Sequence, residues 1–193
     1  MLQGTPETFC PSSREDWRNW LQENHQVKQS VWLIYFKKSS KTPTLSYSDA
    51  VDEALCFGWI DSTRKSLGAD QFTQFFCRRK PQSGWSKVNK QKVNDLIDQG
   101  LMTQAGLDCI ELAKQNGSWT ILDEVEELIV PKDLDLALTA HAGAKDYFLS
   151  LSKSTRKQML QWLVLAKRAE TRQNRIDQIA VASAENRKLK PFY

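Results

Sequence analysis

The run CFGWIDSTRK, residues 56–65, places a tryptophan and an aspartate close together after a glycine. Because the side chains of a strand alternate between its two faces, Trp59 and Asp61 are predicted to point the same way. Arg64 is predicted on the opposite face unless a bulge intervenes. A carboxylate beside an indole ring could hold a ligand or act as an acid or base. The structural alternative is that Asp61 caps a turn or pairs with an arginine of a neighbouring strand.

The run CRRKPQSGWSKVN, residues 77–89, has the chemistry of an anion site. Arg78, Arg79 and Lys80 end a predicted strand, and Ser86 is predicted to cap the helix that follows. Cations beside the free N–H groups of a helix N-terminus bind phosphate, sulfate or carboxylate, and the planar arginine fork suits such groups. The alternative is an exposed basic strand edge that discourages aggregation. A hydroxyl, an indole and an amide are added by Ser83, Trp85 and Asn89.

The run AKRAETRQNRIDQ, residues 166–178, is a third polar group, and it lies within a predicted helical stretch. Lys167, Thr171 and Arg175 are spaced four residues apart, so they are predicted to share one helical face. Arg168 and Arg172 form an adjoining stripe with Arg175. A charge run of this kind is usually a solvated face. A stripe of exposed arginines would alternatively suit nucleic acid or an acidic protein.

Motifs for the common cofactors and nucleophiles are absent from the sequence. It contains no Walker loop, no GxGxxG, no GxSxG and no HExxH. The two histidines lie far along the chain from any candidate nucleophile, and the four cysteines form no CxxC pair or Cys/His cluster. We therefore expect reduced thiols, no metal site and no cofactor. Enzyme status stays open, with Asp61 as the candidate catalytic residue.

The elements that carry the first two runs are predicted to be helices packed on a small sheet. Residues 13–24 begin with a serine cap and have helical apolar spacing, and residues 30–38 are predicted to form a strand buried on both faces. The helix over residues 45–57 stops at Gly58, and two strands follow, joined by a turn at residues 68–70. These elements predict an α+β fold with a small antiparallel sheet of about three strands.

From Ser86 onward the apolar spacing predicts helices only. Residues 86–99 and 103–116 each carry an apolar stripe and are followed by a glycine, and a longer helix or a pair of helices is expected over residues 154–184. Pro131 lies in a connector, near which we place a boundary. The sequence thus predicts an α+β half over residues 1–120 and a helical half over residues 121–193, expected to form one compact body. The stripe of the first helix contains Val88, Val93, Leu96 and Ile97.

Composition and charge are those of a globular protein, with 40% hydrophobic and 26% charged residues. No apolar run is long enough for a membrane helix, and residues 1–16 lack the pattern of a secretory signal, so a cytoplasmic location is expected. The formal net charge of +4 conceals an uneven distribution, because residues 100–150 are acidic and residues 151–193 are strongly basic. The two segments either pair with each other or bind an anionic partner, and we favour mutual pairing.

Four runs of the sequence resemble the bacteriocin-protection family, also called YdeI or OmpD-associated. They are EALCFGWIDS, RRKPQSGWSKVN, GLMTQAGLDCIELAKQNGSW and AKRAETRQNRI, in that order, and the resemblance extends from Trp17 to Ile179. It implies an association with an outer-membrane porin and with resistance to cationic antimicrobial peptides, and it implies no particular reaction. This chain departs from the family by having Arg78 where proline is common, and Asn174 where a basic residue is frequent.

The residues that recur in the family coincide with the three polar groups. By position they fall on Gly58, Trp59, Ile60, Asp61, Arg79, Lys80, Ser83, Trp85, Ser86, Asn89, Gly117, Trp119, Lys167, Glu170, Thr171, Arg172, Arg175 and Ile176. This coincidence suggests one ligand-binding site assembled from all three runs.

We therefore hypothesise a pocket for a small anionic or phosphorylated ligand. Trp59 and Asp61 would line one wall, a second wall would come from residues 79–89, and residues 167–175 would close the pocket. Two other classes of function stay open. One is an enzyme that uses Asp61 as acid or base on an anionic substrate. The other is an interaction module that binds nucleic acid or an acidic protein through the basic C-terminal helix. The residues assigned to the pocket are Trp59, Asp61, Arg79, Lys80, Ser83, Trp85, Ser86, Asn89, Trp119, Lys167, Thr171, Arg172 and Arg175.

Overall fold

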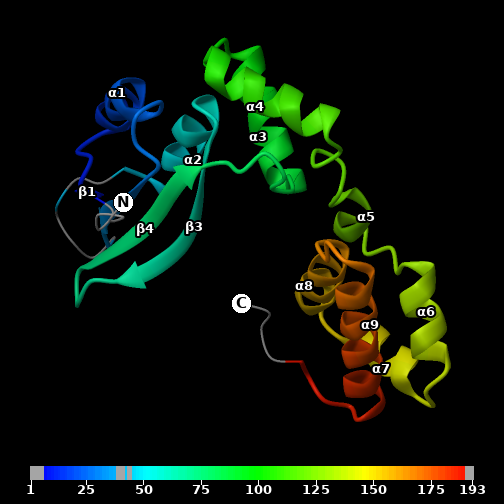
Figure 1. Ribbon diagram of the computed structural model, residues 1–193. Helices are drawn as coiled ribbons and strands as arrows, with labels where there is room; N and C mark the ends of the chain where they lie inside the picture. The colour runs from blue at the N-terminus through cyan, green and yellow to red at the C-terminus, as the bar shows by residue number, and fades with distance from the viewer. Residues whose placement is uncertain (1–6, 38–41, 43–44, 190–193) are drawn as a thin grey trace. The chain divides into compact units, whose positions relative to one another are not determined.

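The computed structural model of the protein describes residues 7–37, 42 and 45–189. These residues divide into two compact units (Figure 1). Unit 1 comprises the described residues up to Ser83 together with Val88–Trp119, and unit 2 comprises Gly84–Lys87 and the described residues from Thr120 onward. The short segment Gly84–Lys87 thus belongs to unit 2, although unit 1 both precedes and follows it in the chain.

Unit 1 contains a four-stranded mixed sheet, so the predicted α+β fold is confirmed. Its strands are β1 (Glu7–Phe9), β2 (Ser30–Phe36), β3 (Trp59–Ser66) and β4 (Gln71–Arg78), in the order β1-β2-β4-β3. The predicted count of about three strands missed β1, which pairs parallel with β2, whereas the other pairs are antiparallel. Three residues are too few to show a strand period, and β1 is held by tertiary contacts such as that of Phe9 with Trp20.

Helices α1 (Arg14–Asn24) and α2 (Tyr47–Cys56) pack beside the sheet. The Ser13 side chain caps α1 by accepting a hydrogen bond from the main-chain N–H of Asp16, as predicted from the serine at the start of this helix. The indole N–H of Trp17 donates to the carbonyl of Ala50 in α2 at 3.0 Å, and its ring meets Phe76 of β4 edge-on. This buried tryptophan therefore joins both helices to the sheet.

Strand β2 is fully buried on one face only, so the prediction of burial on both faces was wrong. Val31, Leu33 and Tyr35 face the helices and are buried, while the residues between them are partly exposed. On the other face, the Lys65 ammonium lies 4.5 Å from the centre of the Trp32 ring. A long alkyl side chain with a charged end can cover an aromatic ring in this way and leave it partly in contact with water.

Helices α3 (Lys87–Asp98) and α4 (Gln104–Gln115) complete this part of the chain. On α3 only Val93 and Leu96 of the predicted stripe are buried, and Val88 is 63% exposed. Helix α4 lies against the end of α2, where the Thr103 hydroxyl donates to the carbonyl of Cys56 at 2.7 Å.

Unit 2 is helical, as predicted for the chain beyond the sheet. It contains α5 (Asp123–Glu126), α6 (Lys132–Thr139), α7 (Ala144–Ser150), α8 (Lys153–Val164) and α9 (Ala169–Ala184). The stretch over residues 154–184 is therefore a pair of helices. The helices bury one shared apolar core, which includes Leu122, Leu134, Phe148, Met159, Leu163 and Ile176.

Ion pairs inside unit 2 confirm the predicted pairing of the acidic middle of the chain with its basic end. Lys157 of α8 binds Glu126 of α5, and Arg172 of α9 binds Asp133 of α6. None of the helices in the described part of the chain is both long and apolar enough to cross a membrane.

The close approach of α4 to α2 predicts that Gly106 does not tolerate a side chain. A Cβ at this position would lie 2.3 Å from the carbonyl oxygen of Cys56. Helix propensity alone would make Gly106→Ala stabilising by about 1 kcal/mol. Because the clash is with the main chain, we expect Gly106→Ala to lower the free energy of unfolding by about 1–3 kcal/mol instead. Urea unfolding followed by tryptophan fluorescence measures the change, and a gain in stability would contradict this packing.

The hydroxyl group of Tyr35 gives a second prediction. Tyr35 is 1% exposed, and its oxygen has no hydrogen-bond partner among the described residues. Burial raises the pKa of this phenol. Removing a buried and unsatisfied polar group by Tyr35→Phe should raise the free energy of unfolding by about 1–2 kcal/mol. Tyr47→Phe is the matched control, because the Tyr47 hydroxyl donates to Asp61 and its loss brings no gain. Equal effects of the two substitutions would show that the Tyr35 hydroxyl is satisfied.

Candidate functional site

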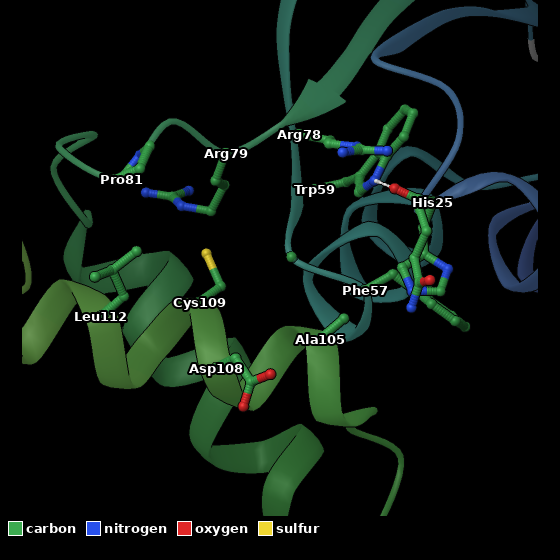
Figure 2. A pocket seen from close by; sticks show the side chains of 12 residues that line it. His25, Phe57, Trp59, Arg78, Arg79, Pro81, Ala105, Asp108, Cys109 and Leu112 are labelled. Atoms are coloured by element: carbon green, nitrogen blue, oxygen red, sulfur yellow. Dashed lines mark hydrogen bonds between the residues drawn. The ribbon is translucent and has the colours of Figure 1, made fainter.

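A pocket of about 330 Å³ lies in unit 1 between the strand ends and α4 (Figure 2). We call it the arginine pocket, because two adjacent arginines at the end of β4 line it. It is lined by His25, Gln26, Phe57, Gly58, Trp59, Arg78, Arg79, Pro81, Ala105, Asp108, Cys109 and Leu112.

The turn between α2 and β3 positions the floor of the pocket. Gly58 has φ +70°, a left-handed conformation that ends the helix and favours glycine. A Cβ at Gly58 would lie 3.1 Å from the carbonyl oxygen of Ala105 and 3.3 Å from the Cβ of Cys109. The main-chain N–H of Arg79 donates to the carbonyl of Gly58 at 3.0 Å. The same glycine thus allows α4 to approach and ties the end of β4 to the turn.

Arg79 is a nearly buried cation at this pocket, with 9% exposure. Burial lowers the pKa of its guanidinium to about 10, although the nearby Cys109, Cys77 and Asp61 act in the opposite direction. The group stays ionised at neutral pH. Its Nη2 atom donates to the carbonyl of Ser83 at 3.4 Å. Figure 2 shows the side chain extending from the strand end across α4, near Cys109.

Arg78 supplies the second guanidinium and pairs with Trp59 across the β3–β4 ladder. Its Nε atom donates to the carbonyl of Lys28 at 2.9 Å. Its Nη2 atom is buried and has no hydrogen-bond partner among the described residues. The adjacent indole N–H of Trp59 donates to the carbonyl of His25 at 3.3 Å. The tryptophan is therefore fixed in place, and Arg78 keeps one buried donor without a partner among the described residues.

Helix α4 forms the opposite wall with one face. Ala105, Asp108, Cys109 and Leu112 have the spacing i, i+3, i+4, i+7 of a single helical stripe. Burial raises the pKa of the Cys109 thiol and outweighs the opposing effect of Arg79, so this thiol is neutral at pH 7. No cluster of three or more His, Cys, Asp or Glu side chains in the described part of the chain could hold a metal ion.

Asp61 lies in a different pocket of unit 1, with a volume of about 260 Å³. Its Oδ2 atom accepts hydrogen bonds from the Tyr47 hydroxyl at 2.8 Å and from the Gln74 amide at 3.1 Å. A bulge between Asp61 and Arg64 brings both side chains to this pocket, which is the exception that the alternation argument left open. The guanidinium of Arg64 stacks on Phe72 at 3.7 Å from the ring centre. Trp59 and Asp61 therefore line separate pockets.

The other residues predicted from the run at residues 77–89 are divided between the two units. Lys80 is exposed, and Ser83 is half-buried in unit 1. Trp85 is buried and Ser86 half-buried in unit 2, whereas Asn89 belongs to α3 of unit 1. Trp119, at the end of unit 1, has two lysine ammonium groups near its ring, those of Lys90 and Lys114.

The predicted helical face of Lys167, Thr171 and Arg175 is wrong for its first member. Helix α9 begins at Ala169, so Lys167 lies in the connection that precedes the helix. Arg172 donates to both carboxylate oxygens of Asp133, at 2.7 and 3.0 Å. Arg175 donates to the carbonyl of Trp162 and stacks on its ring at 4.8 Å from the centre. Both arginines thus have partners inside unit 2, and their part in a shared pocket stays a prediction.

Several residues of the arginine pocket could not be assigned to a ligand site from the sequence. His25, Pro81, Asp108 and Leu112 carried no motif that marks a ligand site, whereas Arg78 was one of the strand-end cations of the predicted anion site. The spacing of the α4 face was visible in the sequence, but an apolar stripe more often marks the core. Leu112 is in fact 43% exposed, which only the structure shows.

Comparison with known proteins gives two family matches. A model described as a domain of unknown function (DUF8412) matches residues 9–109, slightly more than half of the chain. The model of the bacteriocin-protection, YdeI or OmpD-associated family matches residues 127–186, so the resemblance seen in the sequence is confirmed there. No curated protein and no solved structure matches the chain.

The ion pair of Arg172 and Asp133 leads to a prediction about titration. The hydrogen bonds from Arg172 lower the pKa of Asp133, and partial burial opposes them. A lowered folded pKa means that the pair stabilises unit 2 above the unfolded pKa, and that this stability is lost as pH falls through the folded pKa. Arg172→Ala should therefore raise the pKa of Asp133, measured by NMR of its carboxyl carbon. An unchanged Asp133 titration would mean that the pair does not form in solution.

Proposed function

The chain belongs to the family of a domain of unknown function (DUF8412) and carries a C-terminal domain of the bacteriocin-protection, YdeI or OmpD-associated family, and we propose that its unit 1 binds a small anion in the arginine pocket. The pocket volume of about 330 Å³ lies at the lower end of the range for ligand sites, roughly 300–1,000 Å³, so the ligand is a small molecule. The description of the C-terminal family supplies the setting in which we place this binding, protection against bacteriocins.

The observation that carries the proposal is the nearly buried Arg79 guanidinium in a pocket that also contains Arg78. Burial disfavours the charged form of a guanidinium, and the lowered pKa of Arg79 expresses this cost. An anion bound beside Arg79 would favour its charged form and so recover part of that cost. Hydrogen bonds from a charged guanidinium to an anion are stronger than hydrogen bonds between neutral groups. They can also be made in parallel pairs, which adds to their strength.

We prefer a binding protein to the enzyme that the sequence also allowed. The candidate acid or base, Asp61, lines a different pocket from the two arginines and is held there by Tyr47 and Gln74. The thiol in the arginine pocket, Cys109, has a raised pKa and is therefore a poor nucleophile at neutral pH. The nucleic-acid alternative is less well supported too, because Arg172 and Arg175 have intramolecular partners.

The test measures thermal unfolding of the full chain with phosphate, sulfate or acetate, against chloride at the same ionic strength. An anion that binds the folded state at ten times its Kd stabilises it by about 1.4 kcal/mol, which raises the Tm of the wild-type protein. Arg79→Gln should remove this rise. Lys80→Gln is the matched control, since it removes a neighbouring exposed cation that does not line the pocket, and it should keep the rise.

Each outcome of the test has a clear meaning. If none of the anions raises the Tm of the wild-type protein, or if Arg79→Gln responds as the wild type does, the proposal is wrong. Arg172→Ala in the same series tests the larger pocket predicted from the sequence. Loss of the anion effect in both Arg79→Gln and Arg172→Ala would support one site built from both runs, whereas loss in Arg79→Gln alone would confine the site to unit 1.

A further inference from the structure

We infer that the ligand of the arginine pocket is a small monocarboxylate with an apolar body. This inference rests on the proposed function and adds the chemical class of the ligand. It follows from three properties of the pocket lining: its net charge, its apolar wall, and the hydrogen bonds that its polar groups already make.

The charge of the lining matches a single negative charge. Arg78 and Arg79 are the positive groups among the lining residues, and Asp108 on the α4 face is the negative one. The Asp108 side chain is exposed and accepts a hydrogen bond from Gln104 at 2.7 Å. Counted over the lining side chains alone, two positive groups and one negative group match a monoanion. A phosphate dianion or a dicarboxylate would bring a second negative charge into the same pocket as Asp108, which is unfavourable.

The wall beside Arg79 is apolar. Leu112 and Pro81 both line the pocket, and both side chains are exposed, Leu112 to 43%. In Figure 2, Pro81 and Leu112 flank the guanidinium of Arg79 on the side away from Trp59. A carboxylate bound to Arg79 can therefore lay an alkyl or aryl group against these two side chains, and burying that surface tightens binding.

Two of the lining groups that could recognise hydroxyl groups, the Trp59 indole and the His25 ring, are already engaged. The indole N–H of Trp59 donates to the carbonyl of His25. The Nδ1 atom of His25 is hydrogen-bonded to the carbonyl of Leu21 at 2.9 Å. The ring of His25 also packs against Phe57 at 5.1 Å between centres. A sugar phosphate would lose hydration of its hydroxyl groups without gaining partners from these side chains, which disfavours it relative to an apolar acid.

Calorimetric titration of the full chain with hexanoate, benzoate, acetate and phosphate tests the inference. Each methylene group buried against an apolar wall tightens binding about fourfold, so hexanoate should bind at least about tenfold more tightly than acetate. Hexanoate and benzoate should both bind more tightly than phosphate. Arg79→Gln should weaken hexanoate binding about 30-fold, because it removes one partner of a charged hydrogen-bonded pair.

Two matched variants of α4 separate the apolar wall from a general effect on the helix. Leu112→Asn should weaken hexanoate binding about fivefold and leave acetate binding within about twofold. Leu107→Asn is the control, because Leu107 is 38% exposed on the same helix and does not line the pocket. It should leave the binding of both acids unchanged.

The outcomes distinguish this inference from the proposed function. If phosphate or acetate binds as tightly as hexanoate and still depends on Arg79, the anion site stands and the ligand class is wrong. Equal binding of hexanoate by wild type and Leu112→Asn would also overturn the ligand class. If no anion binds in an Arg79-dependent way, both the inference and the proposed function fail.

Discussion

The contact between α4 and the end of α2 is the constraint on which the arginine pocket depends. Gly106 brings the helix main chain against the carbonyl of Cys56, and Gly58 brings the following turn against Ala105. The approach at Gly106 leaves no room for a Cβ, and at Gly58 a Cβ would be held tightly and strained by the positive φ. With α4 fixed there, the face that carries Cys109 and Leu112 stands opposite the end of β4. The pocket is therefore a consequence of two glycines that are not themselves binding groups.

That arrangement places a cation where burial disfavours charge. Arg79 follows directly on the last residue of β4, and its main-chain N–H bonds to the carbonyl of Gly58, so its position is set by the ladder. A structural role alone does not require an ionised group at such a place, because a well-packed apolar side chain is often as stable or more stable there. The nearly buried position of Arg79 beside an open pocket is therefore consistent with the anion binding that we propose for it.

The sequence predicted most of the elements but not the composition of the site. Helix caps, the β-branched strand and the stop at Gly58 are local signals, so α1, β2 and the end of α2 could be predicted. The pocket depends on long-range packing instead. Its α4 wall resembles a core stripe in the sequence, and nothing in the order of residues shows that Leu112 is left partly exposed. The bulge that brings Arg64 to the side of Asp61 is likewise a feature of pairing with β4.

The run at residues 77–89 shows why recurrence in a family does not by itself define one site. Arg79 lines the pocket of unit 1, but Trp85 is buried in unit 2, where a Cβ at Gly84 would come within 2.9 Å of Leu122. In the same segment, the main-chain N–H of Lys87 donates to Glu126. These residues anchor a short segment to the helical core, which gives Gly84 and Trp85 a structural role. The centre of the run thus serves packing, and the ligand contacts that we propose belong to the arginines at its start.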